Sequence, residues 1–253
     1  MSLNTLACIK RVPDTGAKIN LTDDEQDIDA AGLGYTMSPH EECAIEEAVS
    51  QVETHGGTST VLTLGPADAA EQLQTGLAMQ ADEAVLLPTN GEEWDPMATA
   101  EAIASAITEH ETEFDLLFFG NESADSEHYQ VGIRVARELG MPCVTGIKEL
   151  NVEDSSATAH RDIPTGSEIF EIDLPAVITV KEGINEPRYP SMRSKMQARR
   201  KEITEYDPSG TGLGPEKVRL ITPEEEEAAA EVLGTGPDAA GRVVDILEEL
   251  EVV

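Results

Sequence analysis

The sequence predicts an α/β fold in which a mostly parallel sheet carries helices on both faces. Short apolar runs alternate along the chain with amphipathic stretches of helical period. One run, residues 114–119, is apolar nearly throughout, as expected of a strand buried on both faces of a parallel sheet. With 253 residues, 40% of them hydrophobic, the chain is long enough to bury a substantial core.

The first part of the chain follows this alternation. Ser38-Pro39 and Asp95-Pro96 each place an N-cap residue before a proline, so both pairs predict the start of a helix. After Ser38 the apolar residues form one helical stripe: Ala44, Ile45, Ala48, Val49 and Val52. Residues 10–37 are expected to be a long polar connection. The other expected elements are strands at residues 3–9, 58–64, 84–87, 114–119 and 142–145, and helices at residues 66–80 and about 130–139.

The rest of the chain has a different pattern. Strands with polar alternation are expected at residues 147–152, 157–161 and 168–172, as antiparallel additions to the sheet, before a last buried strand at 175–180. We expect an α/β domain at 1–201 and a C-terminal arm at 202–253. The arm opens with a Pro/Gly-rich linker and has short helices near 223–232 and 238–250. The last helix has a narrow apolar stripe, so the arm is expected to pack on its own core or on another chain.

The charge of the chain excludes several partners. The sequence has 50 Asp and Glu against 17 Lys and Arg, a formal net charge of −33. A field of this sign repels phosphates, so binding to nucleic acid or to an anionic membrane is not expected. The acids are spread along the chain, which predicts a surface hydrated in concentrated salt, as in halophiles. The alternative is an ordinary acidic protein from a low-salt organism.

Other features of the sequence indicate a cytoplasmic protein. No apolar run approaches the roughly 18 residues that span a bilayer, so direct membrane insertion is not expected. Residues 1–11 do not have the pattern of a secretory signal. The three cysteines, Cys8, Cys43 and Cys143, are odd in number and follow no disulfide pattern, which fits a reducing compartment.

Signatures of enzyme chemistry are absent from the sequence. No G-x-G-x-x-G follows the first expected strand, and neither a phosphate-binding P-loop nor a G-x-S-x-G motif occurs. The five histidines are isolated from one another and from the cysteines, so no metal site is predicted. We therefore assign no catalytic residue.

One polar loop has the position of a ligand site. Residues 120–132 join the buried strand at 114–119 to a helix. Ligands of open parallel sheets bind at the carboxyl ends of the strands, where a helix N-terminus presents free N–H groups to a phosphate. Gln130, Val131 and Gly132 are placed to supply such donors, and Gly132 permits close backbone approach. The alternative is a plain connecting loop, in which Glu127 would repel a phosphate.

A basic segment stands out against the acidity. Six of the 17 basic residues fall within positions 188–201: Arg188, Arg193, Lys195, Arg199, Arg200 and Lys201. Such a segment is expected to meet an acidic partner or a phosphate, and it carries Met192, an adaptable apolar residue. The alternative is internal pairing with the acidic arm. By contrast, the acids of the helix at residues 38–49 are interpreted as a solvated face.

Two stretches of the sequence match a known family. They read Val180-Lys-Glu-Gly-Ile-Asn-Glu-Pro-Arg-Tyr-Pro-Ser-Met192 and Lys195-Met-Gln-Ala-Arg-Arg-Lys201. Segments in 8–14, 37–49 and 65–82 agree in order and spacing. Together they resemble the beta subunit of electron transfer flavoprotein, and with the acidity of the chain they resemble a halophilic member of that family. The resemblance covers residues 3–201 and extends more weakly through the arm.

The resemblance implies a Rossmann-like fold of the adenine-nucleotide-binding type and a heterodimer with an alpha subunit. Such a pair carries electrons from flavin dehydrogenases to a membrane-bound quinone reductase. Its redox FAD is shared with, and lies mainly on, the alpha subunit. The beta subunit itself holds AMP, or a second FAD in electron-bifurcating members. The protein would then position cofactors, with no catalytic residues of its own.

The resemblance also implies site residues. The nucleotide pocket would use Cys8, Ser38, Leu64, Asp125, His128, Tyr129, Gln130, Val131 and Gly132. The partner-docking segment would use Glu186, Arg188, Tyr189, Met192, Lys195 and Met196, with Met192 at an apolar anchor position where the family usually has Leu. Arg161 and Asp162 match a pair close to the flavin.

Several residues depart from the family pattern. The family usually has Asn at the position of Ser38, and Glu127, His128 and Tyr129 match neither the simple nor the bifurcating form of the phosphate loop. AMP, FAD or an empty pocket therefore all remain open. So do two other classes of function, a free-standing adenine-nucleotide-binding regulatory domain and an adenine-nucleotide hydrolase or ligase.

The charge of −33 leads to a prediction about salt. At about 1 M salt the Debye length is about 3 Å, which screens the self-repulsion of the acids. Dialysis to about 10 mM salt is expected to unfold the protein, because the repulsion then extends over about 30 Å. Circular dichroism during stepwise dialysis measures this. A cooperative melting transition retained at the lowest salt would contradict the prediction.

Overall fold

The computed structural model describes residues 2–210, 214, 217–223, 232–250 and 252. The chain forms two compact units. The first comprises Met1–Asn20 and Asp29–Lys217, and the second Leu21–Ile28 and Val218–Val253.

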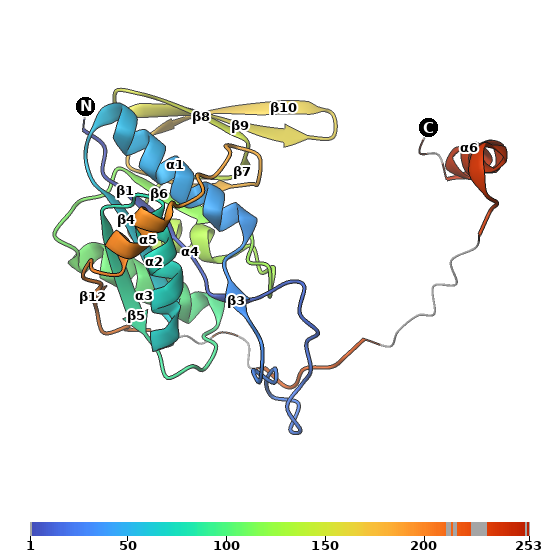
Figure 1. Ribbon diagram of the computed structural model, residues 1–253. Helices are drawn as coiled ribbons and strands as arrows, with labels where there is room; N and C mark the ends of the chain where they lie inside the picture. The colour runs from blue at the N-terminus through green and yellow to red at the C-terminus, as the bar shows by residue number, and fades with distance from the viewer. Residues whose placement is uncertain (1, 211–213, 215–216, 224–231, 251, 253) are drawn as a thin grey trace. The chain divides into compact units, whose positions relative to one another are not determined.

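A seven-stranded parallel sheet forms the centre of the first unit (Figure 1). Its strand order is β12-β5-β4-β1-β6-β11-β7. Because β1 lies between β4 and β6, the direction of winding reverses there, which is the usual place for a ligand crevice in open sheets. The strands are β1 Thr5–Cys8, β4 Ser59–Gly65, β5 Glu83–Pro88, β6 Leu116–Gly120, β7 Cys143–Ile147, β11 Ala176–Val180 and β12 Thr204–Glu205.

Helices cover both faces of this sheet. Helices α1 (Pro39–His55) and α2 (Ala70–Ala78) pack on one face, and α3 (Pro96–Glu109) and α4 (Val131–Leu139) on the other. Strand residues alternate between the two cores: Leu116 and Phe118 contribute to the first, and Leu117 to the second. All three are fully buried. The expected mostly parallel α/β fold is confirmed.

The predicted helix starts are confirmed by the backbone and its caps. Ser38 is the N-cap of α1 and accepts a hydrogen bond from the N–H of Glu41, while Asp95 caps α3 by accepting from Met97 and Ala98. The helix expected at 66–80 is a short 3₁₀ turn, Ala67–Ala69, that continues as α2.

The antiparallel strands form a sheet of their own instead of extending the parallel one. Strands β8 (Glu149–Glu153), β9 (Ser156–Ile163) and β10 (Gly166–Asp173) pair in the order β10-β9-β8. Gly146 has φ of +67° and lies at an irregularity in the β7–β11 register. Ile147, the next residue, still pairs with Val180 of the parallel sheet, and β8 begins at Glu149.

Several short elements were not predicted. Strands β2 (Val12–Pro13) and β3 (Tyr35–Thr36) form a small antiparallel pair within the connection at 10–37, and helix α5 (Met192–Ala198) lies within the basic segment. Strand β12 takes the first compact unit past the boundary expected at residue 201. Elements of two to seven residues are too short to display a hydrophobic period.

The C-terminal helix forms close to where it was expected. A 3₁₀ turn at Gly236–Ala239 leads into α6 (Ala240–Glu249). The helix expected near 223–232 lies almost wholly outside the described residues. Within the second unit, the N–H of Leu220 donates to the carbonyl of Glu25 at 2.8 Å, and Arg219 pairs with the Glu25 carboxylate at 3.2 Å.

Candidate functional site

The carboxyl edge of the sheet brings together segments from distant parts of the sequence. Cys8, the last residue of β1, is in register with Leu62 of β4 and Phe119 of β6. The end of β4 therefore places Leu64 at the same edge, and the end of β6 places the loop at 120–132 there. Cys8 is buried, and burial raises the pKa of its thiol well above the ordinary value.

Glu41 ties the end of β1 to the start of α1. One carboxylate oxygen accepts the N–H of Lys10 at 2.8 Å, and the other accepts the N–H of Ser38 at 3.0 Å. Burial raises the pKa of Glu41 to about 8, and these backbone hydrogen bonds act against that rise. These two hydrogen bonds, together called the Glu41 clamp, place Ser38 next to the end of β1.

Lys10 connects this clamp to the loop at 120–132. Its ammonium lies 2.7 Å from the carboxylate of Asp125 and 3.3 Å from that of Glu93. The structure thus brings Cys8, Ser38 and Asp125 into one neighbourhood. Among the described residues, Lys10 is the lysine or arginine that the ion pairs place at this edge.

The N-terminus of α4 fits an anionic group. Its N-cap, Gln130, makes no side-chain cap hydrogen bond, so the first N–H groups of the helix are not capped by that side chain. A Cβ on Gly132 would lie 3.0 Å from Thr179 and 3.1 Å from Phe119. The absent side chain thus lets the helix approach the sheet closely, and this is the role of Gly132 in the structure. Free N–H groups at a helix N-terminus are the usual donors to an anionic group such as a phosphate.

The remaining loop residues of the predicted nucleotide pocket, 128–131, lie in different environments. Tyr129 is half exposed and has φ of +57°, and the carboxylate of Glu122 raises the pKa of its phenol. His128 is also exposed. The side-chain oxygen of Gln130 accepts two hydrogen bonds from Arg134, at 3.0 and 2.9 Å, and Val131 packs against the core.

Arg161 is held firmly on β9. Its guanidinium donates to one oxygen of Glu168 at 2.8 and 2.6 Å and to the carbonyl of Thr145 at 3.3 Å, and lies over the ring of Phe170. Asp162, the next residue, is exposed. The adjacent pair therefore combines a fixed cation with a solvent-accessible carboxylate.

The segment at 185–196 presents apolar side chains to solvent. Tyr189 is 89% exposed, Met192 76% and Met196 60%. The ammonium of Lys195 lies 5.0 Å from the centroid of the Tyr189 ring. Exposed apolar groups of this size, next to basic residues, are typical of a protein–protein contact.

Arg188, in the same segment, contacts helix α1 instead of solvent alone. It forms ion pairs with Glu46 at 2.8 Å and Glu53 at 2.7 Å, both on α1. Burial raises the pKa of Glu46, but the hydrogen bonds from Arg188 outweigh this and hold the pKa below its usual range. Arg188 therefore anchors the segment to α1, and its acidic partners lie on that helix.

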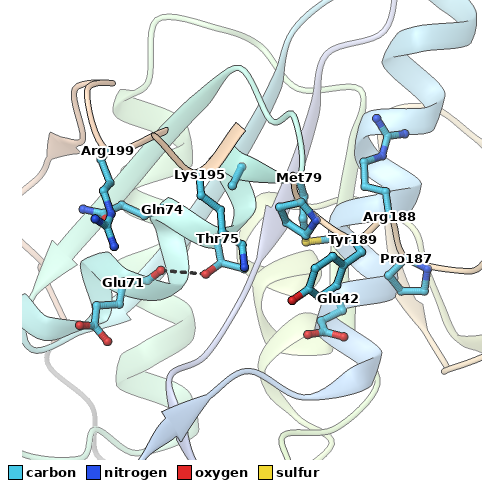
Figure 2. A pocket seen from close by; sticks show the side chains of 12 residues that line it. Glu42, Glu71, Gln74, Thr75, Met79, Pro187, Arg188, Tyr189, Lys195 and Arg199 are labelled. Carbon is cyan, nitrogen blue, oxygen red and sulfur yellow. Dashed lines mark hydrogen bonds between the residues drawn. The ribbon is translucent and has the colours of Figure 1, made fainter. Parts of the chain in front are cut away.

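A hollow of about 450 Å³ lies beside this segment, between it and helices α1 and α2 (Figure 2). Figure 2 shows Tyr189 and Glu42 at one end and Glu71 and Arg199 at the other. The hollow contains none of the predicted nucleotide-pocket residues.

Comparison with known proteins identifies the family. A model of the electron transfer flavoprotein domain matches residues 27–210. The electron transfer flavoprotein subunit beta of Bacillus subtilis (strain 168) is 33% identical over 254 residues, which cover 97% of each chain. The chain belongs to the electron transfer flavoprotein family.

Other relatives agree with this result. The electron transfer flavoprotein subunit beta of Mycobacterium leprae (strain TN) is 33% identical, with 99% of each chain covered. The caffeyl-CoA reductase-Etf complex subunit CarD of Acetobacterium woodii is 31% identical over 99% of this chain and all of that one. The resemblance to the beta subunit of electron transfer flavoprotein is confirmed. Electron transfer flavoprotein beta subunits transfer electrons, associate with flavin and pair with an alpha subunit.

One interpretation of the sequence is wrong. The acids of α1 are not simply a solvated face, because Glu41, Glu46 and Glu47 are 5%, 8% and 8% exposed. Each has an internal partner: Glu41 the backbone N–H groups above, Glu46 the guanidinium of Arg188, and Glu47 the amides of Gln51 and Asn185. The Ser38-x-x-Glu41 spacing of a capping box was the signal available for Glu41.

Two negative findings apply to the described part of the chain. No group of three His, Cys, Asp or Glu residues is arranged there to hold a metal ion. No described helix is long and apolar enough to cross a membrane.

The Arg188 pair leads to a prediction about stability. Arg188→Gln is expected to lower the free energy of unfolding by about 1–3 kcal/mol, because it leaves the buried Glu46 without its cation. The partners' pKa values are lowered in the folded state, so the stabilisation is full above the ordinary glutamate pKa and is lost as pH falls through the folded values. The difference from the unmodified protein should therefore shrink towards about pH 3.

Denaturant unfolding in concentrated salt, repeated across this pH range, measures the effect. Arg193→Gln, on an exposed residue of the same segment, is the matched control and should change stability by less than about 0.5 kcal/mol. Equal effects of the two substitutions, or a difference independent of pH, would show that Arg188 is not an anchor.

Proposed function

We propose that this chain and an alpha subunit form a heterodimer that accepts electrons from flavin dehydrogenases and delivers them to a membrane-bound quinone reductase, in the cytoplasm. The observation that carries the proposal is the match to electron transfer flavoprotein beta subunits over nearly the whole chain. FAD, bound mainly on the alpha subunit, would supply the redox chemistry. The residues of this chain would orient partners and cofactors.

The nucleotide of this subunit is proposed to be AMP, bound at the carboxyl edge of the sheet. The uncapped N-terminus of α4 and the ammonium of Lys10 favour a phosphate there. Cys8, Ser38 and Leu64, at the ends of β1 and β4 and the start of α1, would form the floor of the pocket. The loop residues Asp125 and 128–132 would enclose it. A second FAD in this pocket is the competing occupant.

Arg161 and Asp162 are proposed to lie near the flavin. The bonds to Glu168 and Thr145 hold the guanidinium of Arg161 in one orientation, so a fixed positive charge would face the cofactor. The exposed Asp162 could pair with a basic residue of the alpha subunit. The C-terminal arm at 202–253 is proposed to pack on that subunit, since α6 has exposed apolar residues such as Val243 and Val244.

The dehydrogenase is proposed to dock on the segment at 185–196. Tyr189, Met192 and Met196 would supply the apolar contact, and Lys195 the attraction to an acidic partner. Glu186 and Arg188 lie at the base of the segment, where Arg188 anchors it to α1. Concentrated salt would screen the electrostatic part of docking, which would leave the apolar part as the larger contribution.

Cofactor counting tests the nucleotide proposal. The heterodimer is expected to be yellow and to release one FAD and one AMP per pair on denaturation. Chromatography of the released nucleotides, standardised against protein concentration, gives the ratio. Two FAD and no AMP would support the bifurcating alternative and overturn the AMP assignment. A colourless monomer, recovered even on co-expression with an alpha subunit, would favour the free-standing regulatory domain.

Substitution of the proposed anchor tests docking. Met192→Ala is expected to raise the KM of the electron-donating dehydrogenase for the heterodimer about tenfold, because it removes an exposed apolar contact worth about 1–2 kcal/mol. Steady-state reduction of the heterodimer by the dehydrogenase measures this.

The control is Ile19→Ala, which removes an exposed apolar side chain elsewhere on the first unit. Its KM should stay within about twofold of the unmodified value. An unchanged KM for Met192→Ala, with flavin content and folding intact, would refute the docking assignment.

A further inference from the structure

We propose that Lys10 receives the phosphate of the nucleotide, and that Asp125 is a built-in competitor that a phosphate must displace from it. This inference rests on the proposed nucleotide site and adds how that site is filled. It gives Lys10, for which sequence analysis predicted no role, the part of phosphate ligand.

The ammonium of Lys10 already has a full set of hydrogen-bond and ion-pair partners. A lysine ammonium has three N–H donors and no acceptor. In the structure three oxygens lie around it: Asp125 at 2.7 Å, Glu93 at 3.3 Å and Ser126 at 3.4 Å. A phosphate oxygen can therefore bind Lys10 only by replacing one of them.

Asp125 is the partner that the phosphate is expected to displace, because of its place in the chain. It lies on the loop that leads into α4, whose uncapped N-terminus would hold the same phosphate. A carboxylate left against a phosphate would repel it, since both groups are anionic. Burial raises the pKa of Asp125, but Lys10 and its hydrogen bonds outweigh this and keep the pKa below its usual range, so the carboxylate is ionised near neutral pH.

Asp125 can leave Lys10 at small cost to its own hydrogen bonding. Its other oxygen already accepts the N–H of Ser126 at 2.8 Å and the hydroxyl of Ser126 at 3.3 Å. Only the oxygen that faces Lys10 needs a new partner, and water can supply it. The side chain of Asp125 is 25% exposed, so water can reach it.

Lys10 can make the exchange without moving its backbone. Its N–H is fixed by the buried carboxylate of Glu41 at 2.8 Å, while its side chain is 35% exposed. The ammonium can thus turn from Asp125 to a ligand on a fixed base. The Lys10–Asp125 ion pair is thus the closed state of the site, and binding of the nucleotide breaks it. Replacement of Asp125 is expected to favour the open state, in which the ammonium is free for a phosphate.

A double-mutant cycle tests this inference. Binding of AMP to the nucleotide-stripped heterodimer is measured by calorimetry in concentrated salt. Asp125→Asn is expected to tighten AMP binding about fivefold, and Lys10→Met to weaken it about tenfold or more. In the Lys10→Met background, Asp125→Asn should change the AMP affinity less than about twofold, because Asp125 then has no ammonium to pair with.

Two controls isolate the contact. Glu127→Gln removes the same charge from an exposed residue of the same loop. It measures how much the AMP affinity changes through long-range electrostatics alone. Asp125→Asn must raise the AMP affinity by more than this. Adenosine, which has no phosphate, should bind the Lys10→Met variant as it binds the unmodified protein. Lys10→Arg, which keeps the charge, should retain most of the AMP affinity.

The outcomes separate this inference from the proposed function. If the unmodified heterodimer binds AMP but Asp125→Asn is no tighter than Glu127→Gln, or if adenosine also loses affinity with Lys10→Met, the inference is overturned while the nucleotide site stands. If the unmodified heterodimer does not bind AMP, both are overturned.

Discussion

The position of β1 in the middle of the parallel sheet is the constraint on which the rest of the structure depends. Because β4 and β6 flank it in parallel, three carboxyl ends meet at one edge. The buried carboxyl group of Glu41 then fixes the residues after β1 to the N-cap of α1, through the N–H groups of Lys10 and Ser38. Segments more than 100 residues apart in the chain, such as Cys8 and the loop at 120–132, become neighbours as a consequence.

The charge of the chain has two roles that composition alone does not separate. The net charge of −33 is the basis for the predicted dependence of folding on salt. Glu41, Glu46 and Glu47 are instead buried and paired, and they join α1 to β1 and to the segment at 185–196. The basic residues divide in the same way: Arg188 is used internally, and Lys195 faces solvent. Arg188 is therefore less available to a partner than the basic segment suggested.

Features set by local pattern could be predicted from the sequence, and features set by long-range pairing could not. The buried strand at 114–119 and the capped starts at Ser38 and Asp95 depend on neighbouring residues, and they were found. The position of the loop at 120–132 at the carboxyl edge of the sheet followed from the rule for parallel sheets. The pairs Lys10–Asp125 and Arg188–Glu46 join residues 115 and 142 positions apart, and no local spacing signals them. Gly132 was noted for its small size, but only the sheet beneath α4 shows what that size is for.

Hydrogen exchange of the heterodimer with and without AMP tests most directly whether the carboxyl edge is the nucleotide site. The account predicts that AMP protects amides in the segments that meet there: 8–10, 37–41, 64–66 and 121–133. The segment at 185–196, which lies beside a separate hollow, should exchange at the same rate in both states. Protection confined to other segments, or no protection at saturating AMP, would contradict the account.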